Sequence, residues 1–227
     1  SIMKSFSPWG PLIYQNEISE EFHTFLLDGL KKSRRYGDNY KNKLVGQINC
    51  QRGALYSNDE LKSFLDEHIG SFSIENLKRS QQQSSFHEPT SKSKEFSDKN
   101  RLIEEYEKDP KSLPVHYELP EPWINFQKSN EYNPIHEHTG EVSAIIFIDI
   151  PEEIKNERDT SQFDHKTNGC LEFLYDCSTS FVVTPHNKMI FLFPASLKHT
   201  VYPYQSDVER ITMSFNLPDK PKFIIER

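Results

Sequence analysis

The chain has 227 residues, a formal net charge of -7 and an aromatic content of 12%. This length suits one domain, and the aromatic content indicates a packed core. The acidic balance argues against duplex nucleic acid as a partner, because such binding needs an excess of Lys and Arg. No apolar run approaches the roughly 20 residues that a membrane helix needs, and the first residues lack the pattern of a secretory leader.

The three cysteines, Cys50, Cys170 and Cys177, show no paired spacing. An odd and sparse set of this kind is not a disulfide framework, so we expect free thiols in a reducing compartment. Together with the missing leader and membrane segment, this predicts a cytoplasmic protein.

The first half of the chain is predicted to be mainly helical. Phe22, Phe25 and Leu26 recur at helical spacing, and Leu61, Phe64 and Leu65 form a second stripe. The polar run at 79–100 is predicted to be a long mobile loop. The expected elements are a strand over 11–14 and helices over about 19–35, 58–69 and 102–106.

The second half is predicted to be a β structure. Short strands follow one another without helices between them, which indicates an antiparallel sandwich or a jelly roll. A polar insertion at 151–168 interrupts them, and we favour a substrate lid over an inert loop for it. The expected strands cover 123–128, 142–150, 170–175, 180–184, 189–193 and 211–216.

Two histidines stand two residues apart immediately before the expected strand 142–150. In an extended segment His136 and His138 point to one side and Glu137 to the other. Two imidazoles on one side can hold Fe, Zn, Cu or Ni. On its own the pair is a weak signal for a metal site.

A third histidine follows the apolar strand 189–193. His199 lies between Leu197 and Val201, so taken alone it also fits a buried core position. In combination with His136 and His138 it completes a candidate set of three metal ligands.

The last strand carries an arginine on its polar face. Ile211, Met213 and Phe215 alternate with Arg210 and Thr212, so one face is apolar and the other presents a guanidinium beside a hydroxyl. An arginine that points into a β core needs an anionic partner, and a carboxylate matches its planar fork. The alternative is an arginine that faces solvent and pairs with a neighbouring acid.

The order of a His-x-His pair, a distant His and an Arg-x-Thr pair resembles the 2-oxoglutarate and Fe(II)-dependent oxygenase superfamily. The closest resemblance is to its prolyl-4-hydroxylase-like branch, which is common in bacteria and tailed phages, and it covers about residues 123–216. The motifs that carry it are Trp123-Ile-Asn125, Asn133-Pro-Ile-His136-Glu-His138-Thr-Gly140, Gly169-Cys-Leu-Glu-Phe173, Phe193-Pro-Ala-Ser-Leu-Lys-His199-Thr-Val201-Tyr-Pro203 and Arg210-Ile-Thr212-Met-Ser214-Phe-Asn216.

This resemblance implies a fold and an activity. The fold is α+β, with a double-stranded β-helix (a cupin-like jelly roll) over about 116–220 and supporting helices over about 1–115, all in one domain, 1–227. The activity is hydroxylation of a small-molecule or peptide substrate, coupled to decarboxylation of 2-oxoglutarate to succinate. Fe(II) would be bound by His136, His138 and His199.

The resemblance also implies a binding site for 2-oxoglutarate. Arg210 would bind its far carboxylate with help from Thr212. Asn125 is a further candidate for hydrogen bonding to the co-substrate, although an asparagine at a sheet edge is a simpler interpretation.

One residue departs from the usual pattern of the superfamily. The position two residues after the first histidine is normally a carboxylate, and here it is His138. Glu141 could supply a carboxylate if the segment curls, whereas Glu137 should point away if the segment is extended.

Two other functions remain open from the sequence. A β-sandwich dioxygenase with three histidines could bind metal and need neither 2-oxoglutarate nor Arg210. A non-catalytic jelly-roll protein, such as a binding or virion component, would bind no metal tightly. The Arg-x-Thr pair favours the 2-oxoglutarate-dependent oxygenase over both.

Overall fold

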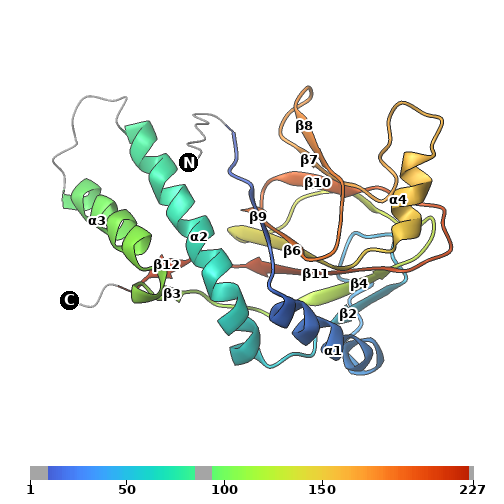
Figure 1. Cartoon of the computed structure of the whole chain (residues 1–227), viewed down its shortest axis with the longest axis horizontal. Coiled ribbons are helices and arrows are strands. Elements are labelled where there is room, and N and C mark those ends of the chain that lie inside the picture. Colours follow the sequence, from blue (N-terminus) through green and yellow to red (C-terminus); the bar gives the residue numbers. More distant parts are fainter. Residues whose placement is uncertain (1–9, 85–93, 225–227) are drawn as a thin grey trace.

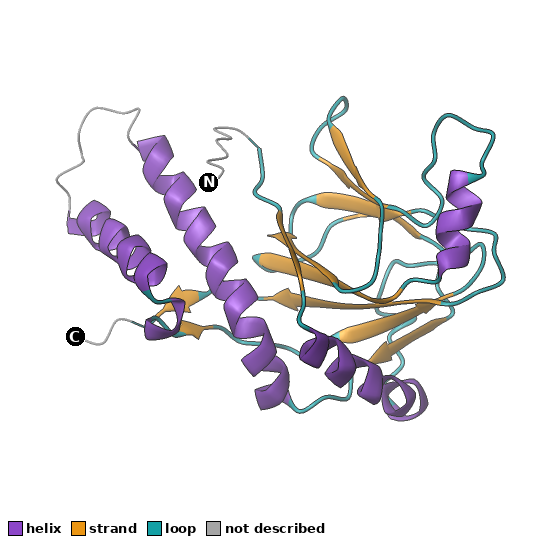
Figure 2. Cartoon of the chain, viewed as in Figure 1, coloured by secondary structure: helices purple, strands orange, loops and turns teal. Residues whose placement is uncertain are grey.

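The computed structural model describes residues 10–84 and 94–224, which form a β core with helices against one side (Figures 1 and 2). The major sheet has the order β1-β9-β6-β11-β4-β2, and the minor sheet has the order β5-β10-β7-β8. The strands of the major sheet are β1 (Tyr14–Glu17), β2 (Cys50–Gly53), β4 (Trp123–Gln127), β6 (Val142–Asp149), β9 (Met189–Pro194) and β11 (Arg210–Leu217). Those of the minor sheet are β5 (Asn133–His136), β7 (Leu171–Leu174), β8 (Ser180–Val183) and β10 (Lys198–Val201).

Four α-helices accompany the sheets among the described residues. They are α1 (Glu20–Tyr36), α2 (Asn58–Ser84), α3 (Lys94–Lys108) and α4 (Glu152–Asp159). A small sheet of β3 (Val115–His116) and β12 (Lys222–Phe223) lies near α3, and the 3-10 turn η1 (Pro110–Ser112) leads into it. Figure 1 places α3 and α4 at opposite ends of the molecule.

Helices α1 and α2 cover the outer face of the major sheet. Helix α1 begins at Ser19, whose hydroxyl accepts a hydrogen bond from the backbone N–H of Phe22. Phe22 and Leu26 of α1 and Leu61 and Leu65 of α2 are buried. These side chains join one apolar cluster with the outward-facing strand residues Ile124, Ile146, Ile190 and Met213.

The inner face of the major sheet packs against the minor sheet. Ile145, Phe147 and Phe191 lie on this face because side chains alternate along each strand. They form a second cluster with Phe173 and Val201 of the minor sheet. The two antiparallel sheets therefore enclose one interior, which confirms the predicted α+β fold with a jelly-roll core.

The predicted mobile loop at 79–100 is wrong in its described parts. Helix α2 continues to Ser84 and α3 begins at Lys94; residues 85–93 lie outside the described residues. The two helices are joined by the buried Gln81, whose amide nitrogen donates to the Phe96 carbonyl at 2.9 Å and to Asn100 Oδ1 at 3.0 Å. These polar residues are helical because they meet another helix.

The insertion at 151–168 is a helix followed by a turn. Ile154 and Arg158 of α4 are buried, and Arg158 donates a hydrogen bond to the Asn168 carbonyl. The Glu157 carboxylate accepts hydrogen bonds from the backbone N–H groups of Gln205 and Ser206. The helix is thus attached to the connection between β10 and β11.

The structure bears on two further predictions, which concern the cysteines and membrane-spanning helices. Cys50, Cys170 and Cys177 are all free thiols, as predicted. Among the helices in 10–84 and 94–224, none combines the length and the apolarity of a membrane span.

Candidate metal centre and its two cavities

The three predicted histidines lie together at one end of the jelly roll. Strands β5 and β10 pair antiparallel with His136 opposite His199, and the backbone N–H of His138 donates to the Ala195 carbonyl. The ring centroid of His136 lies 4.2 Å from that of His199 and 4.9 Å from that of His138. One ring nitrogen of each residue lies within 4.8 Å of the others, so three imidazoles could hold one metal ion.

Backbone carbonyls orient two of these rings. Nδ1 of His136 lies 2.7 Å from the Pro134 carbonyl oxygen, and Nδ1 of His199 lies 3.0 Å from that of Leu197. A carbonyl oxygen only accepts, so each Nδ1 carries the proton and each Nε2 keeps a free lone pair. This is the usual arrangement around a metal-binding histidine.

Burial keeps the three imidazoles neutral. It lowers the pKa of His138 to about 4 and that of His199 to about 3, with repulsion from His136 acting in the same direction. Burial also lowers the pKa of His136. Neutral imidazoles are the form that binds a metal, so the cluster is ready to bind at neutral pH.

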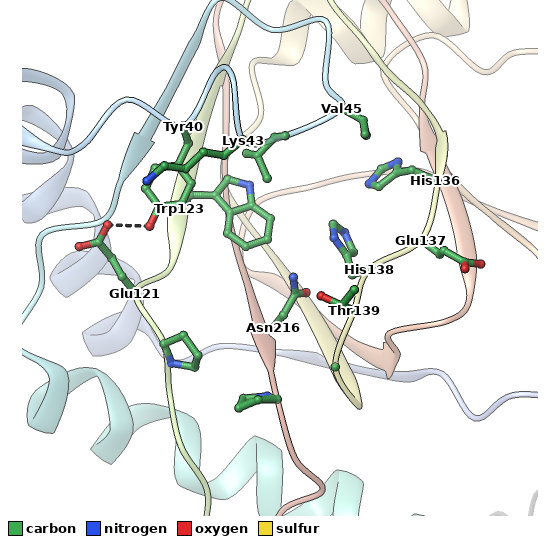
Figure 3. A pocket seen from close by; sticks show the side chains of 14 residues that line it. Tyr40, Lys43, Val45, Glu121, Trp123, His136, Glu137, His138, Thr139 and Asn216 are labelled. Carbon is green, nitrogen blue, oxygen red and sulfur yellow. Dashed lines mark hydrogen bonds between the residues drawn. The ribbon is translucent and has the colours of Figure 1, made fainter.

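The two neighbouring glutamates are not part of this cluster. Figure 3 shows Glu137 pointing away from His136 and His138, as the extended segment predicts. The Glu141 carboxylate lies 3.9 Å from Lys220 Nζ. Among the described residues, the group of potential metal ligands around this point consists of the three histidines.

An outer cavity of about 700 Å³ opens above the histidines (Figure 3). Its wall includes Tyr40 and Trp123, whose rings stack with centroids 6.4 Å apart. The Tyr40 hydroxyl donates to the Glu121 carboxylate at 2.8 Å, which fixes the loop before β2. The other lining residues are Lys43, Leu44, Val45, Pro120, His136, Glu137, His138, Thr139, Gly140, Asn216 and Pro218.

A smaller cavity of about 30 Å³ adjoins the first and is called the inner cavity, because its wall includes the buried His199. It shares Trp123, His136 and His138 with the outer cavity and adds His199. The further polar residues in its wall are Gln51, Asn125, Asn133, Ser143 and Ser214. The loop before β2 passes close to its wall, because a Cβ on Gly46 would lie 2.1 Å from Asn133 Oδ1.

A chain of amides connects the inner cavity to β11. The side-chain nitrogen of Gln51 donates to Asn125 Oδ1 at 2.8 Å, and that of Asn125 donates to Thr212 Oγ1 at 3.3 Å. Gln51, Asn125 and Thr212 are opposite one another in the register of β2, β4 and β11. Asn125 therefore lines the cavity, whereas Thr212 lines neither cavity and contacts Asn125.

Arg210 is buried inside the jelly roll, 2% exposed, two residues before Thr212 on β11. Its Nη1 donates to Gln127 Oε1 at 2.7 Å, and its guanidinium lies 5.2 Å from the Phe147 ring centroid. Its Nε is buried without a hydrogen-bond partner. Burial lowers the pKa of Arg210 to about 10.

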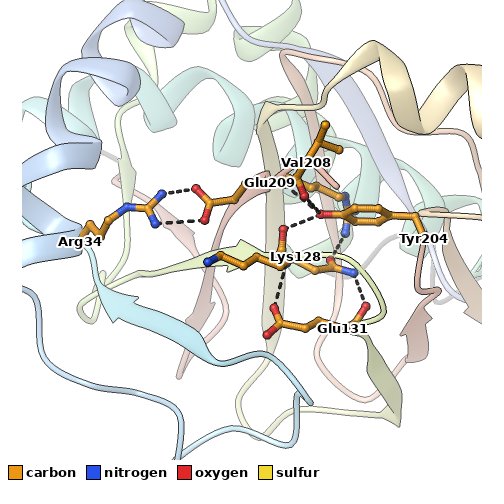
Figure 4. A network of polar contacts seen from close by, with 8 residues as sticks. Arg34, Lys128, Glu131, Tyr204, Val208 and Glu209 are labelled. Carbon is orange, nitrogen blue, oxygen red and sulfur yellow. Dashed lines mark hydrogen bonds and ion pairs between the residues drawn. The ribbon is translucent and has the colours of Figure 1, made fainter. Parts of the chain in front are cut away.

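The charge of Arg210 has no acid to balance it among the described residues. Its neighbour Gln127 donates in turn to the Glu131 carbonyl. The Tyr204 hydroxyl accepts from the Arg210 backbone N–H and donates to the backbone carbonyls of Gln127 and Val208 (Figure 4). Glu209, the residue before it, pairs instead with Arg34 on the outside (Figure 4). Arg210 therefore faces inward, and the predicted alternative of a solvent-facing ion pair is wrong. Arg210 lines neither cavity.

The histidines and Arg210 were identifiable from the sequence, whereas three polar residues were not. Gln51 lies in a strand that was not predicted, and Gln127 and Tyr40 carried no motif. The period-two pattern around Asn125 could have identified Gln127 as a residue on the same face. The predicted lid at 151–168 contributes no residue to either cavity.

Comparison with known proteins gives one family match. Residues 121–216 match the family model described as "Putative 2OG-Fe(II) oxygenase". No curated protein matches the chain.

Similar solved structures share little sequence with this chain. A prolyl hydroxylase of Trichoplax adhaerens, in complex with a hypoxia inducible factor oxygen degradation domain peptide fragment, is 12% identical with a TM-score of 0.49 over 92% of this chain and 84% of that one. A Pseudomonas putida prolyl-4-hydroxylase is 10% identical with a TM-score of 0.45 over 90% and 92% of the two chains. A Burkholderia pseudomallei oxidoreductase of the 2OG-Fe(II) oxygenase family is 16% identical with a TM-score of 0.35, and the match spans 45% of this chain and under half, 44%, of that one.

Proposed function

Residues 121–216 belong to the 2-oxoglutarate and Fe(II)-dependent oxygenase family, and on that premise we propose which residues carry the activity. In this proposal His136, His138 and His199 bind Fe(II), and Arg210 binds the far carboxylate of 2-oxoglutarate. The observation that carries it is the combination, in one interior, of three converging imidazoles and a buried guanidinium without an acid partner.

The three histidines fit Fe(II) in number and in chemistry. Imidazole nitrogen is a common ligand of non-haem iron, and three protein ligands leave positions open for small molecules. Nε2 of His136 and of His199 is free because each Nδ1 is held by a carbonyl. His138 takes the place of the usual carboxylate, which leaves the full charge of the metal to be balanced by the co-substrate.

Arg210 fits a dicarboxylate that enters from the metal side. Arg210, Thr212 and Ser214 follow one another on the inner face of β11, and Ser214 lines the cavity beneath the histidines. A buried guanidinium without a countercharge is costly, and a carboxylate that reached its free Nε would remove that cost. Gln127 holds the other side of the guanidinium in place.

Bound Fe(II) supplies the activation of dioxygen that couples decarboxylation of 2-oxoglutarate to hydroxylation of a substrate. The chain's own residues would bind and orient the reactants. Trp123 and Phe193 border the histidines and exclude water, and the outer cavity has room for a small molecule or a side chain of a peptide. We propose that residues 1–227 act as one domain, since the helical half covers the sheet that forms the site.

The first experiment tests the activity and its metal ligands. The purified protein with Fe(II) should convert 2-oxoglutarate to succinate, and His136→Ala and His199→Ala should each bind Mn(II) at least about tenfold more weakly in calorimetry. His186→Ala is the control because His186 is exposed and distant in sequence from the cluster. Wild-type protein that forms no succinate, or ligand variants that bind metal normally, would refute the proposal.

The second experiment tests Arg210 through its neighbour. Gln127→Glu places a carboxylate beside the guanidinium, where it should compete with the co-substrate. Arg210→Leu removes the guanidinium. Breaking a buried charged pair costs about 2–5 kcal/mol, so each variant should weaken 2-oxoglutarate binding by tens to thousands of fold. Mn(II) binding should stay unchanged in both variants. Unchanged 2-oxoglutarate affinity would instead support a three-histidine dioxygenase that does not use this co-substrate.

A further inference from the structure

Gln51 has a polar atom that the described residues leave unsatisfied. Its side chain is 1% exposed and lines the inner cavity beside the histidines. The amide nitrogen donates to Asn125, and the amide oxygen Oε1 is buried without a hydrogen-bond partner. A buried acceptor without a donor costs about 1–3 kcal/mol, so something else is expected to satisfy this amide.

The amide chain can also run in the opposite direction. A half-turn of the amides of Gln51 and Asn125 exchanges their oxygen and nitrogen and leaves the shape of both side chains unchanged. Thr212 would then donate to Asn125, and Asn125 would donate to Gln51. In this arrangement the Gln51 oxygen is satisfied, and its NH₂ group is left as a donor beside the inner cavity.

The ligand proposed for this cavity decides between the two directions. A dicarboxylate offers only acceptor oxygens, so it needs donors around it. With the Gln51 oxygen toward the cavity, a carboxylate would meet a second acceptor. With the Gln51 nitrogen toward the cavity, the same carboxylate would receive a charge-assisted hydrogen bond, which is about twice as strong as a neutral one.

We propose that Gln51 is a binding residue for 2-oxoglutarate, whose amide nitrogen donates to the carboxylate at the metal end, and that Asn125 and Thr212 position this amide. The assignment to the metal end follows from the cavity, which Gln51 shares with all three histidines and not with Arg210. Gln51 lies on β2, outside the segment 121–216 that matches the family. The inference rests on the proposed function, because it concerns the same ligand.

The test is to titrate the Mn(II)-loaded full chain with 2-oxoglutarate and to measure the binding by calorimetry. Gln51→Glu replaces the donor by an acceptor of nearly the same shape and should weaken binding by about 100-fold or more; Gln51→Leu removes the donor without adding charge and should weaken it by about 10-fold. Mn(II) affinity should be unchanged. Gln47→Glu is the matched control, since it adds the same charge at an exposed amide four residues earlier.

A second ligand checks which end of the co-substrate is bound. Oxalate chelates a metal and lacks the far carboxylate, so Gln51→Leu should weaken oxalate binding while Arg210→Leu should not. Normal 2-oxoglutarate binding by folded Gln51→Leu would overturn the inference even if Gln51→Glu binds poorly, because added charge would then explain the effect. If the Gln51 variants bind normally and Arg210→Leu does not, the inference alone fails; if wild-type protein does not bind 2-oxoglutarate, the proposed function fails with it.

Discussion

His138 determines the charge of the proposed iron site. Three imidazoles leave the site one unit more positive than two imidazoles and a carboxylate. The nearest glutamates do not correct this, since Glu137 points away and Glu141 lies near Lys220. We therefore expect the metal to depend on His138 as a ligand and on the co-substrate for its negative charge.

Substitution of His138 tests this directly. His138→Ala should weaken Mn(II) binding at least about tenfold because one ligand is lost. His138→Asp restores the usual set, so it should keep the metal and change the absorbance of the Fe(II) complex with 2-oxoglutarate. Glu141→Ala serves as the control. Normal metal binding by His138→Ala, together with weak binding by Glu141→Ala, would transfer the role to Glu141.

The residues of the site were only partly predictable. Alternation along a strand was enough to place His136 beside His138 and to put Arg210 and Thr212 on one face, but it left open whether that face points inward or to solvent. The partner of Arg210 could not be predicted, because Gln127 meets it only through the register of β4 and β11. Gln51 was missed for the same reason, since it reaches the site from a strand more than 70 residues earlier in the chain.

At the scale of elements, one carboxylate of helix α4 attaches it to the connection between β10 and β11. Glu157 accepts hydrogen bonds from Gln205 and Ser206 and from the Asn168 amide. Burial raises the pKa of Glu157, but these hydrogen bonds outweigh it and the pKa is lowered overall. The ionised carboxylate therefore stabilises the attachment of α4 to the connection that leads into β11.

Glu157→Gln should lower the free energy of unfolding by about 1–2 kcal/mol at pH 7, because a charge-assisted contact is replaced by a neutral one. A carboxyl whose pKa is depressed on folding stabilises the fold above its unfolded value of about 4.3 and loses this effect as pH falls through the folded value. The difference between the two proteins should thus shrink in acid. Denaturant titrations at pH 7 and below pH 4, with Glu152→Gln as the control, measure it; a constant difference would contradict the prediction.

The helical elements show where sequence patterns stop being informative. The strands at 142–150, 189–193 and 211–216 were predicted to within two residues, because apolar runs between turn residues identify them. The polar run at 79–100 carried no such pattern. Its helical parts are stabilised by contacts between α2 and α3, such as those of Gln81, and contacts between distant segments are not visible in a local pattern.

On the scale of the whole molecule, an antiparallel sandwich or jelly roll with a helical cover was predictable as a class, and the family resemblance favoured the jelly roll. Regularly spaced strands after a helical half predict that arrangement. The order of strands was not predictable, since β1, β2 and β4 join β6, β9 and β11 in the same sheet although α1 separates β1 from β2, and α2 and α3 separate β2 from β4, in the chain. This pairing is what brings Gln51 and the loop before β2 to the histidines.

The adjacency of the two cavities has a kinetic consequence. The inner cavity adjoins the outer one, and both are bordered by Leu44 and Val45. We propose that a small ligand bound in the inner cavity passes this rim on entry and on exit, so rim substitutions should change the rates of both steps. Val45→Trp, at a side chain that is 53% exposed, should slow the association of 2-oxoglutarate in stopped-flow measurements; an unchanged association rate would show that the ligand does not enter past Val45. If ligands enter by this route, 2-oxoglutarate would bind before the substrate that fills the outer cavity, and succinate would leave after the hydroxylated product.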